Sequence, residues 1–260
     1  MTDTPKIAAA PVAVFREDRK ARRRRLTERL EALRERTNLL ELELRDYTND
    51  YFRVCIFGSA RIKAHDDIYK ITEQVAFLLG REGIDVLTGG GPGLMEAANK
   101  GVLRGRTDSG SKSRSYGISI DVGFREPPSE HLDIRHHHRR FSSRLDDFMR
   151  LSHATVVTPG GIGTMLELFF CWQLLQFEHI PERPLILVGK AFWSGLMEWV
   201  EEIQVKRGLV SPSDMRWVKI ADTPEEALSF IVPEHQKFLE EMRRRREAGL
   251  PPPKVEPPRD

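Results

Sequence analysis

The regular alternation of short apolar runs with segments of helical periodicity limits the folds open to this chain more than any other feature. The apolar runs "VCIF", "ATVV" and "LILV" are continuous, and each precedes a segment with apolar residues every three or four positions. Continuously apolar strands are typical of parallel sheets buried on both faces. The pattern therefore predicts an α/β fold: a Rossmann-like doubly wound parallel sheet with an added N-terminal helix.

Each expected element has a recognisable segment of its own. Strands are expected at residues 53–59, 84–88, 116–120, 154–161, 184–189 and 215–221. Helices are expected at residues 67–83, 94–105, 141–152, 164–176, 191–208 and 223–246. The chain contains no internal repeat.

The chain divides into three expected parts. Residues 1–48 hold a disordered start and a basic helix, residues 49–242 form the Rossmann-like domain, and residues 243–260 form a basic, proline-rich disordered tail. The arginine-rich first helix has the charge spacing of a solvated surface. Assembly of the protein through this helix is favoured over nucleic-acid binding, because no aromatic residues or glycines interrupt the arginines.

Composition excludes several classes of protein. The net charge is only +2, and no apolar run approaches the roughly 20 residues that cross a bilayer. Cys55 and Cys171 lie within apolar runs, which favours buried, reduced thiols over a disulfide framework. Pro11 and an acidic start disfavour a signal peptide. We therefore expect a cytoplasmic protein without membrane contact.

Three glycine-bearing turns each follow an expected strand. They are Gly58-Ser59, the run Gly89 to Gly93, and Gly160-Gly161-Ile162-Gly163. Turns that follow parallel strands share the carboxyl edge of the sheet, where ligands bind in open α/β folds. Glycine lets backbone N–H groups approach an anion, and the next helix adds its positive end. The three turns predict a phosphate site, although none of them is a standard nucleotide motif.

Thr164 and Glu167 allow two interpretations. Their spacing is that of a capping box, in which the glutamate folds back onto the start of its helix. Alternatively, Glu167 lies one turn into the helix and faces a sugar whose phosphate rests on the loop. Thr164 could fill both roles, whereas the Glu167 side chain cannot fold back onto its cap and face a sugar at the same time.

The residues Pro159 to Glu167 fit the pattern PGGxGTxxE, and the chain thereby resembles the LOG family of cytokinin riboside 5′-monophosphate phosphoribohydrolases and bacterial nucleotide nucleosidases. The glycine loop Gly89 to Met95 and the opening "FGSAR" also match, so the resemblance spans about residues 50–230. The family arginine, fifteen residues before the motif proline, falls on Arg144; Arg139 and Arg140 are nearby competitors. The family's neighbouring histidine and lysine are not kept here, which resembles the larger bacterial members more than the compact plant enzymes.

The resemblance implies a reaction and a site. A nucleoside 5′-monophosphate such as AMP would be hydrolysed to free base and ribose 5-phosphate, without a cofactor, by an enzyme that is at least a homodimer. Glu167 and Arg144 would be catalytic. The residues implied to bind substrate are Gly58, Ser59, Gly90, Gly91, Gly93, Met95, Glu96, Gly160, Gly161, Gly163 and Thr164. The alternative is a non-catalytic carrier or sensor of a phosphorylated ligand, such as molybdenum cofactor.

Other features suggest less. The histidines of "RHHHRR" (135–140) alternate in direction on a strand and have no Cys or Glu at ligand spacing, so no metal site is expected. No lysine has the context of a pyridoxal phosphate Schiff base, which disfavours a decarboxylase. We expect core or subunit contacts from the bulky residues Phe169, Phe170, Trp172 and Phe177.

Overall fold

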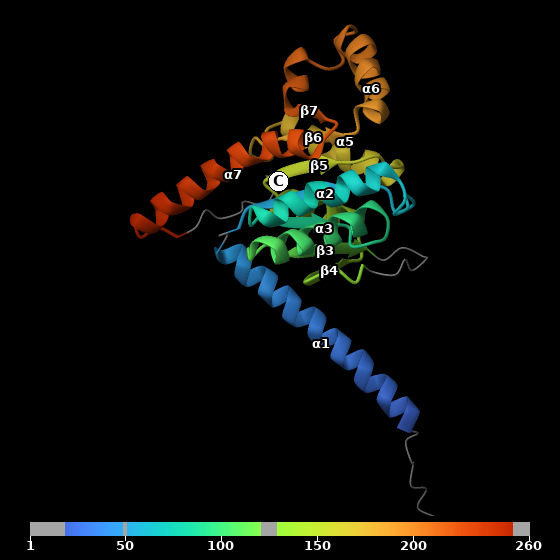
Figure 1. Ribbon diagram of the computed structural model, residues 1–260, viewed down its shortest axis with the longest axis vertical. Helices are drawn as coiled ribbons and strands as arrows, with labels where there is room; N and C mark the ends of the chain where they lie inside the picture. Colours follow the sequence, from blue (N-terminus) through green and yellow to red (C-terminus); the bar gives the residue numbers. More distant parts are fainter. Residues whose placement is uncertain (1–18, 49–50, 121–128, 252–260) are drawn as a thin grey trace, which may run out of the picture. The chain divides into compact units, whose positions relative to one another are not determined.

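A computed structural model describes residues 19–48, 51–120 and 129–251 of the 260-residue chain (Figure 1). The expected disordered start and the end of the proline-rich tail lie outside these ranges. The described chain divides into two compact units after Thr37, inside helix α1 (Arg19–Thr48), and the expected three-part division stays a prediction. Within the first unit, Arg24 Nε lies 2.9 Å from Glu28 Oε1 on an exposed helix surface.

The second unit contains a seven-stranded sheet in its described part, and every pairing is parallel. Its order is β4-β3-β2-β1-β5-β6-β7. The strands are β1 (Arg53–Phe57), β2 (Asp85–Thr88), β3 (Ser115–Ile120), β4 (Ile134–His138), β5 (Ala154–Val157), β6 (Leu185–Val188) and β7 (Val218–Ala221). The chain runs outward from β1 to β4, then returns to the other side of β1. This reversal is the topological switch point at which α/β folds bind ligands.

Helices follow the strands of this unit, except that β4 comes directly after β3 in the described element order (Figure 1). They are α2 (Asp67–Arg81), α3 (Leu94–Ser109), α4 (Phe141–Leu151), α5 (Ile162–Gln176), α6 (Lys190–Trp199), the π-helical turn η1 (Val200–Val205), the 3-10 helix η2 (Pro212–Trp217) and α7 (Pro224–Glu247). Helix α7 reaches Glu247, so residues 243–247 are helical and do not belong to a disordered tail. No described helix has the length and apolar character of a membrane span.

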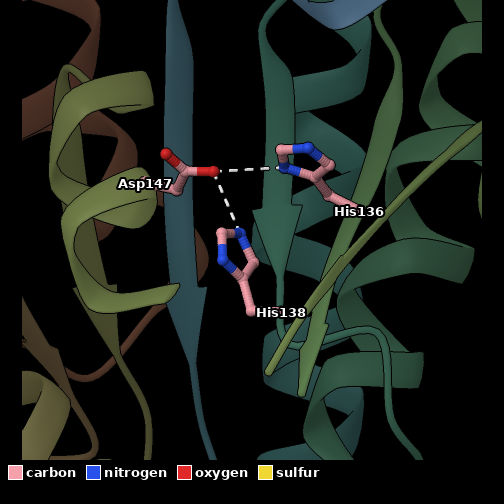
Figure 2. A group of neighbouring side chains, drawn as sticks. All are labelled: His136, His138 and Asp147. Carbon is pink, nitrogen blue, oxygen red and sulfur yellow. Dashed lines mark hydrogen bonds and ion pairs between the residues drawn. The ribbon is translucent and has the colours of Figure 1, made fainter. Parts of the chain in front are cut away.

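Strand β4 is the one described strand that the sequence pattern did not predict. It lies at the edge of the sheet and pairs only with β3 among the described strands. Of its residues only Ile134 is buried, and the remainder are arginine and histidine. Figure 2 shows His136 and His138 of this strand. An edge strand with one buried residue carries no continuous apolar run, so its periodicity is too weak to recognise.

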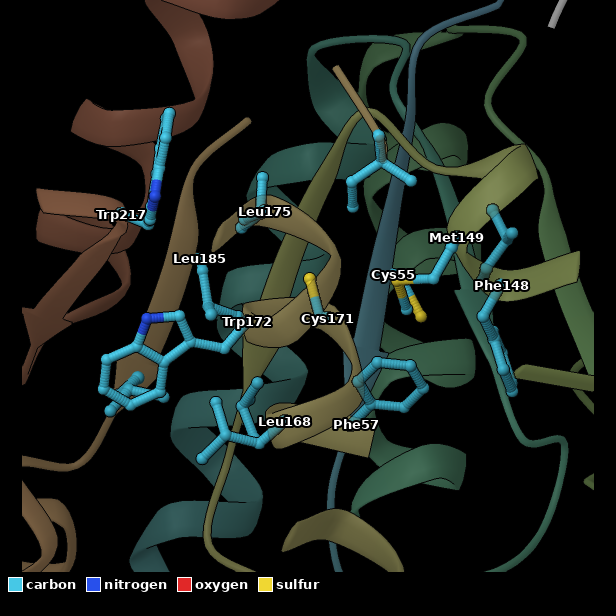
Figure 3. Close-up of a cluster of buried hydrophobic side chains, with 14 of the residues drawn as sticks. Cys55, Phe57, Phe148, Met149, Leu168, Cys171, Trp172, Leu175, Leu185 and Trp217 are labelled. Atoms are coloured by element: carbon cyan, nitrogen blue, oxygen red, sulfur yellow. The ribbon is translucent and has the colours of Figure 1, made fainter. Parts of the chain in front are cut away.

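A separate apolar core covers each face of the sheet. Residues of α2, α3 and α7 pack on one face, and residues of α4, α5 and α6 pack on the other. Figure 3 shows Leu168, Cys171 and Trp172 of α5 in the same core as Phe57 of β1. Both cysteines are buried and unpaired, as expected. Two opposite cores fix the sheet in place and leave its carboxyl edge to the loops.

The bulky residues of α5 divide between core and surface. Trp172 belongs to the core, and its indole N–H donates to the Asp214 carbonyl at 2.9 Å. Phe170 is partly buried against the same core, whereas Phe169 and Phe177 are exposed. The expectation of core contacts is confirmed for Trp172 and Phe170. The exposed Phe169 and Phe177 remain available to a partner.

Candidate active site

The three glycine-bearing turns follow the adjacent strands β2, β1 and β5, and backbone hydrogen bonds join them. Ser59, after β1, is at the centre. Its N–H donates to the Pro159 carbonyl at 3.1 Å, and its carbonyl accepts from the Leu94 N–H at 2.9 Å. The first turn is thereby tied to the turns on both sides, so that all three form one continuous layer at the carboxyl edge.

Close approach within this layer requires glycine at Gly58 and Gly93. A Cβ atom at Gly58 would lie 2.1 Å from Oγ1 of Thr158, whose hydroxyl donates to the Phe57 carbonyl at 2.8 Å. Gly93 has φ 70° and ψ −131°, and a Cβ there would lie 2.4 Å from the Ser59 carbonyl oxygen. A side chain at either position would force the turns apart.

The remaining glycines of the second turn shape the loop before α3. Gly90 has a φ of +71°; its N–H donates to Thr88 Oγ1 at 3.0 Å and its carbonyl accepts from the Ser129 N–H at 2.9 Å. Gly91 lies between it and Gly93. Met95 and Glu96 occupy the first turn of α3, where the Met95 sulfur lies beside Gly89 and the Glu96 side chain is partly exposed.

The third turn leads into α5. Gly160 lies against the Thr164 side chain, Gly161 precedes the first helical residue, and Gly163 is in the first turn. A Cβ at Gly161 or Gly163 would meet nothing within 4 Å. The first-turn amides of a helix have no acceptor within that helix, and they carry its positive partial charge. The turn therefore presents unhindered backbone donors suited to an anion.

Thr164 and Glu167 do not form a capping box. Helix α5 begins at Ile162, with Gly161 at its N-cap, so Thr164 is already the third helical residue. The same spacing does form a capping box at the start of α7, where Glu226 N–H donates to Thr223 Oγ1 at 3.1 Å. The capping interpretation is therefore wrong for Thr164 and Glu167, and the Glu167 carboxylate does not fold back onto the start of its helix.

The Glu167 carboxylate meets Arg144 of α4. Arg144 Nη1 donates to Glu167 Oε1 at 3.2 Å, and its Nε donates to the Ile118 carbonyl at 2.8 Å. The two side chains are only 12% and 11% exposed. Arg139 and Arg140 are exposed and precede α4, so Arg144 is the arginine that the fold brings to the glutamate.

The same guanidinium reaches the second glycine turn. Its Nη2 would lie 2.5 Å from a Cβ at Gly89, so a side chain at this position would displace the guanidinium from where it now lies. The sequence placed Gly89 in the second glycine turn, although not among the residues implied to bind substrate. Arg144 therefore connects α4, the second glycine turn and Glu167.

Burial raises the pKa of Glu167 to about 7, because the loss of hydration outweighs the charge and the hydrogen bond of Arg144. A carboxyl group with a pKa near neutrality exchanges protons readily at physiological pH. Such shifts gather at functional sites, where a buried acid and a fixed cation are held together. The pair has the properties expected of a general acid or base.

Ser59 has a partly structural role. In addition to its backbone bonds, its Oγ accepts from the Arg61 N–H at 3.1 Å. Several residues with an expected role lie in one layer: Gly58, Ser59, Gly93 and the third glycine turn. Arg144 links Glu167 to the second glycine turn. Within the described part of the chain, the three-residue group able to hold a metal ion is His136, His138 and Asp147, on β4 and α4.

A doubly wound parallel sheet with glycine turns at its switch point defines the Rossmann-like class of fold, in which ligands bind at that edge of the sheet. Residues 95–231 match the family described as "Possible lysine decarboxylase", which is more than half of the chain. The chain therefore belongs to this family, the LOG family, as its motifs indicated.

Two relatives with named activities are similar in sequence to part of this chain. It is 31% identical over 140 residues to the pyrimidine/purine nucleotide 5′-monophosphate nucleosidase of Escherichia coli K12, over 52% of this chain and 30% of that protein. It is 28% identical over 202 residues to LOGL2 of Oryza sativa, a probable cytokinin riboside 5′-monophosphate phosphoribohydrolase, over 74% of this chain and 78% of the relative. The match thus spans under a third of the bacterial protein.

Among solved structures, the molybdenum cofactor binding protein of Rippkaea orientalis superposes with a TM-score of 0.53 over 70% of this chain and 96% of that one. The two sequences are 20% identical, so the likeness is one of fold. The Rossmann-like architecture that the sequence predicted is confirmed.

Proposed function

We propose that this protein is an N-glycosyl hydrolase that splits nucleoside 5′-monophosphates into free base and ribose 5-phosphate. The observation that carries the proposal is the buried Arg144–Glu167 pair beside joined glycine turns at the switch point. Relatives named for nucleotide 5′-monophosphate cleavage support the same class of reaction. AMP is the first substrate to test.

The chemistry follows from charge. The amides of the glycine turns and the N-terminus of α5 bind the 5′-phosphate. As the glycosidic bond breaks, C1′ of the ribose becomes positively charged, and the Glu167 carboxylate stabilises that charge and orients or deprotonates the attacking water. Arg144 holds the carboxylate in position and lowers its pKa relative to burial alone. A purine is a better leaving group than an alcohol, so one carboxylate suffices where sugar hydrolases use two.

The deciding experiment is incubation with AMP, GMP, CMP and isopentenyladenosine monophosphate, with chromatography for free base and ribose 5-phosphate. Release of base from at least one nucleotide, in a 1:1 ratio with ribose 5-phosphate, is the expected result. A protein that binds these nucleotides and releases no base would instead be a carrier or sensor of phosphorylated ligands.

We expect kcat/KM for AMP to rise with pH and level off above a midpoint of about 7. The active form carries an ionised Glu167, whose pKa burial raises to about 7, so activity is gained as that proton is lost. The measurement is the initial rate of base release at low AMP concentration between pH 5 and 9.

The second ionisation of the substrate phosphate, near pH 6, falls in the same range and needs a control. Arg144→Gln removes the cation that lowers the pKa of Glu167, so its midpoint moves to higher pH while the substrate is unchanged. Equal midpoints in the two proteins would assign the pH dependence to the substrate and not to Glu167.

We also propose that the protein self-associates through α5. Ile162, Leu166 and Phe169 recur at helical spacing and are exposed, Ile162 by 88%. Large exposed apolar side chains on one helix face mark an interaction site. This face begins at the N-terminus of α5, so a second copy would border the proposed phosphate site.

Light scattering is expected to give at least a dimer for the parent protein. Leu166→Glu places a charge on the proposed interface and shifts the protein toward monomer, whereas Leu239→Glu alters an exposed leucine of α7 and leaves the mass unchanged. A parent protein that is monomeric, or an oligomer that tolerates Leu166→Glu, would contradict the interface.

A further inference from the structure

Three potential metal ligands converge between strand β4 and helix α4 (Figure 2). Oδ2 of Asp147 lies 3.2 Å from Nδ1 of His136 and 3.0 Å from Nε2 of His138. The candidate ligand atoms all lie within 4.8 Å of one another. This arrangement is independent of the nucleosidase proposal.

Strand geometry explains the convergence. Successive side chains on a strand point to opposite faces, so His136 and His138 share one face and the intervening His137 points away. His137 is exposed and lies 3.0 Å from the Ser119 hydroxyl. The alternation that argued against a metal site for adjacent histidines therefore supplies two ligands, and α4 adds Asp147. Sequence spacing alone could not supply that third residue.

The outer atoms of two ligands are held by neighbours. Nδ1 of His138 lies 3.0 Å from the Ser143 hydroxyl, and Oδ1 of Asp147 accepts from Arg150 at 3.2 Å. These contacts orient Nε2 of His138 and Oδ2 of Asp147 toward the common centre. Metal-binding histidines and carboxylates are usually fixed by such outer hydrogen bonds.

His136 supplies the least explained contact. Its Nδ1 is buried and makes no hydrogen bond of acceptable geometry within the described part of the chain, although Asp147 Oδ2 is 3.2 Å away. Two ligands of one tetrahedral zinc ion, each about 2.0–2.1 Å from the metal, lie roughly 3.3 Å apart. The His–Asp distances therefore match edges of a coordination tetrahedron.

We propose that His136, His138 and Asp147 bind one divalent transition-metal ion of the zinc class, with water completing the coordination. Two imidazoles and one carboxylate suit Zn²⁺ or Co²⁺, whereas Mg²⁺ and Ca²⁺ prefer oxygen ligands. Arg150 offsets the carboxylate charge, so the affinity is moderate. The ion joins β4 to α4 one turn after Arg144, and it thereby steadies the helix that carries this arginine.

The test uses the full chain after dialysis against a chelator. Co²⁺ is added in steps, its visible absorption bands report tetrahedral coordination, and Zn²⁺ is then used to displace it. Saturation at one ion per chain, displacement by Zn²⁺, no displacement by Mg²⁺ and a higher melting temperature with Zn²⁺ are expected.

Variants locate the site. Asp147→Asn keeps the shape of the side chain, and His138→Ala removes one ligand; each weakens Co²⁺ binding by more than about tenfold. His137→Ala, the matched control on the same strand, binds Co²⁺ like the parent. Absence of binding in the parent, competition by Mg²⁺, or equal binding by His138→Ala and the parent would overturn the proposal. Circular dichroism of each variant separates lost ligation from lost folding.

Discussion

Glu167→Gln is expected to lower kcat for AMP hydrolysis by about 10²–10³-fold, with KM little changed. Glutamine keeps the size of the side chain and an oxygen that accepts from Arg144, so the fold is retained. It carries no charge, so it stabilises the cationic ribose poorly and cannot take a proton from water. Steady-state rates of adenine release measure the loss.

Two controls separate chemistry from structure. Glu240→Gln alters an exposed glutamate of α7 and is expected to be fully active. AMP should raise the melting temperature of Glu167→Gln as it does that of the parent, because the glycine turns still bind the phosphate. A Glu167→Gln variant that releases adenine at the parental rate would remove Glu167 from the mechanism and leave the nucleosidase activity to other residues.

Gly93→Ala is expected to destabilise the protein by about 3 kcal/mol, which corresponds to a melting temperature lower by roughly 6–12 °C. Gly93 adopts φ 70° and ψ −131°, a conformation that is essentially confined to glycine. The added methyl group also meets the Ser59 carbonyl, which accepts from Leu94 N–H in the same layer. Strain and overlap therefore act together.

Gly110→Ala is the matched control. Gly110 ends α3 with φ 70° and ψ 16°, the ordinary left-handed region, and a Cβ there meets nothing within 4 Å. Its replacement costs only about 1 kcal/mol. Thermal melting of both variants compares a crowded glycine with an open one. If Gly93→Ala lost no more stability than Gly110→Ala, the first two turns would not be packed too closely for a side chain at Gly93.

The sequence predicted most of the sheet because strands buried on both faces need continuous apolar runs. β1, β2, β3, β5 and β6 lie within or close to their expected ranges. Expected β7 was too long, since Pro212–Trp217 forms a 3-10 helix whose start is fixed by Ser211 N–H donating to Asp214. The long helix expected at 191–208 changes into a π-helical turn after Trp199.

The sequence predicted the start of α5 two residues too late. A break was expected before Thr164 because glycine disfavours helices, but Gly163 is already helical. That shift of two residues excludes the capping box and directs Glu167 to Arg144. Spacing alone could not decide between the two interpretations, because the same spacing does cap α7.

By itself, the sequence determined the class of fold, the edge at which the glycine turns meet and the family. Each of these depends on local periodicity or on a contiguous motif. Only the tertiary structure decided that Arg144 reaches Glu167, and that Asp147 meets two histidines of an edge strand. Those contacts join residues far apart in the chain, and their distances depend on how α4 packs against its neighbours rather than on any spacing in the sequence.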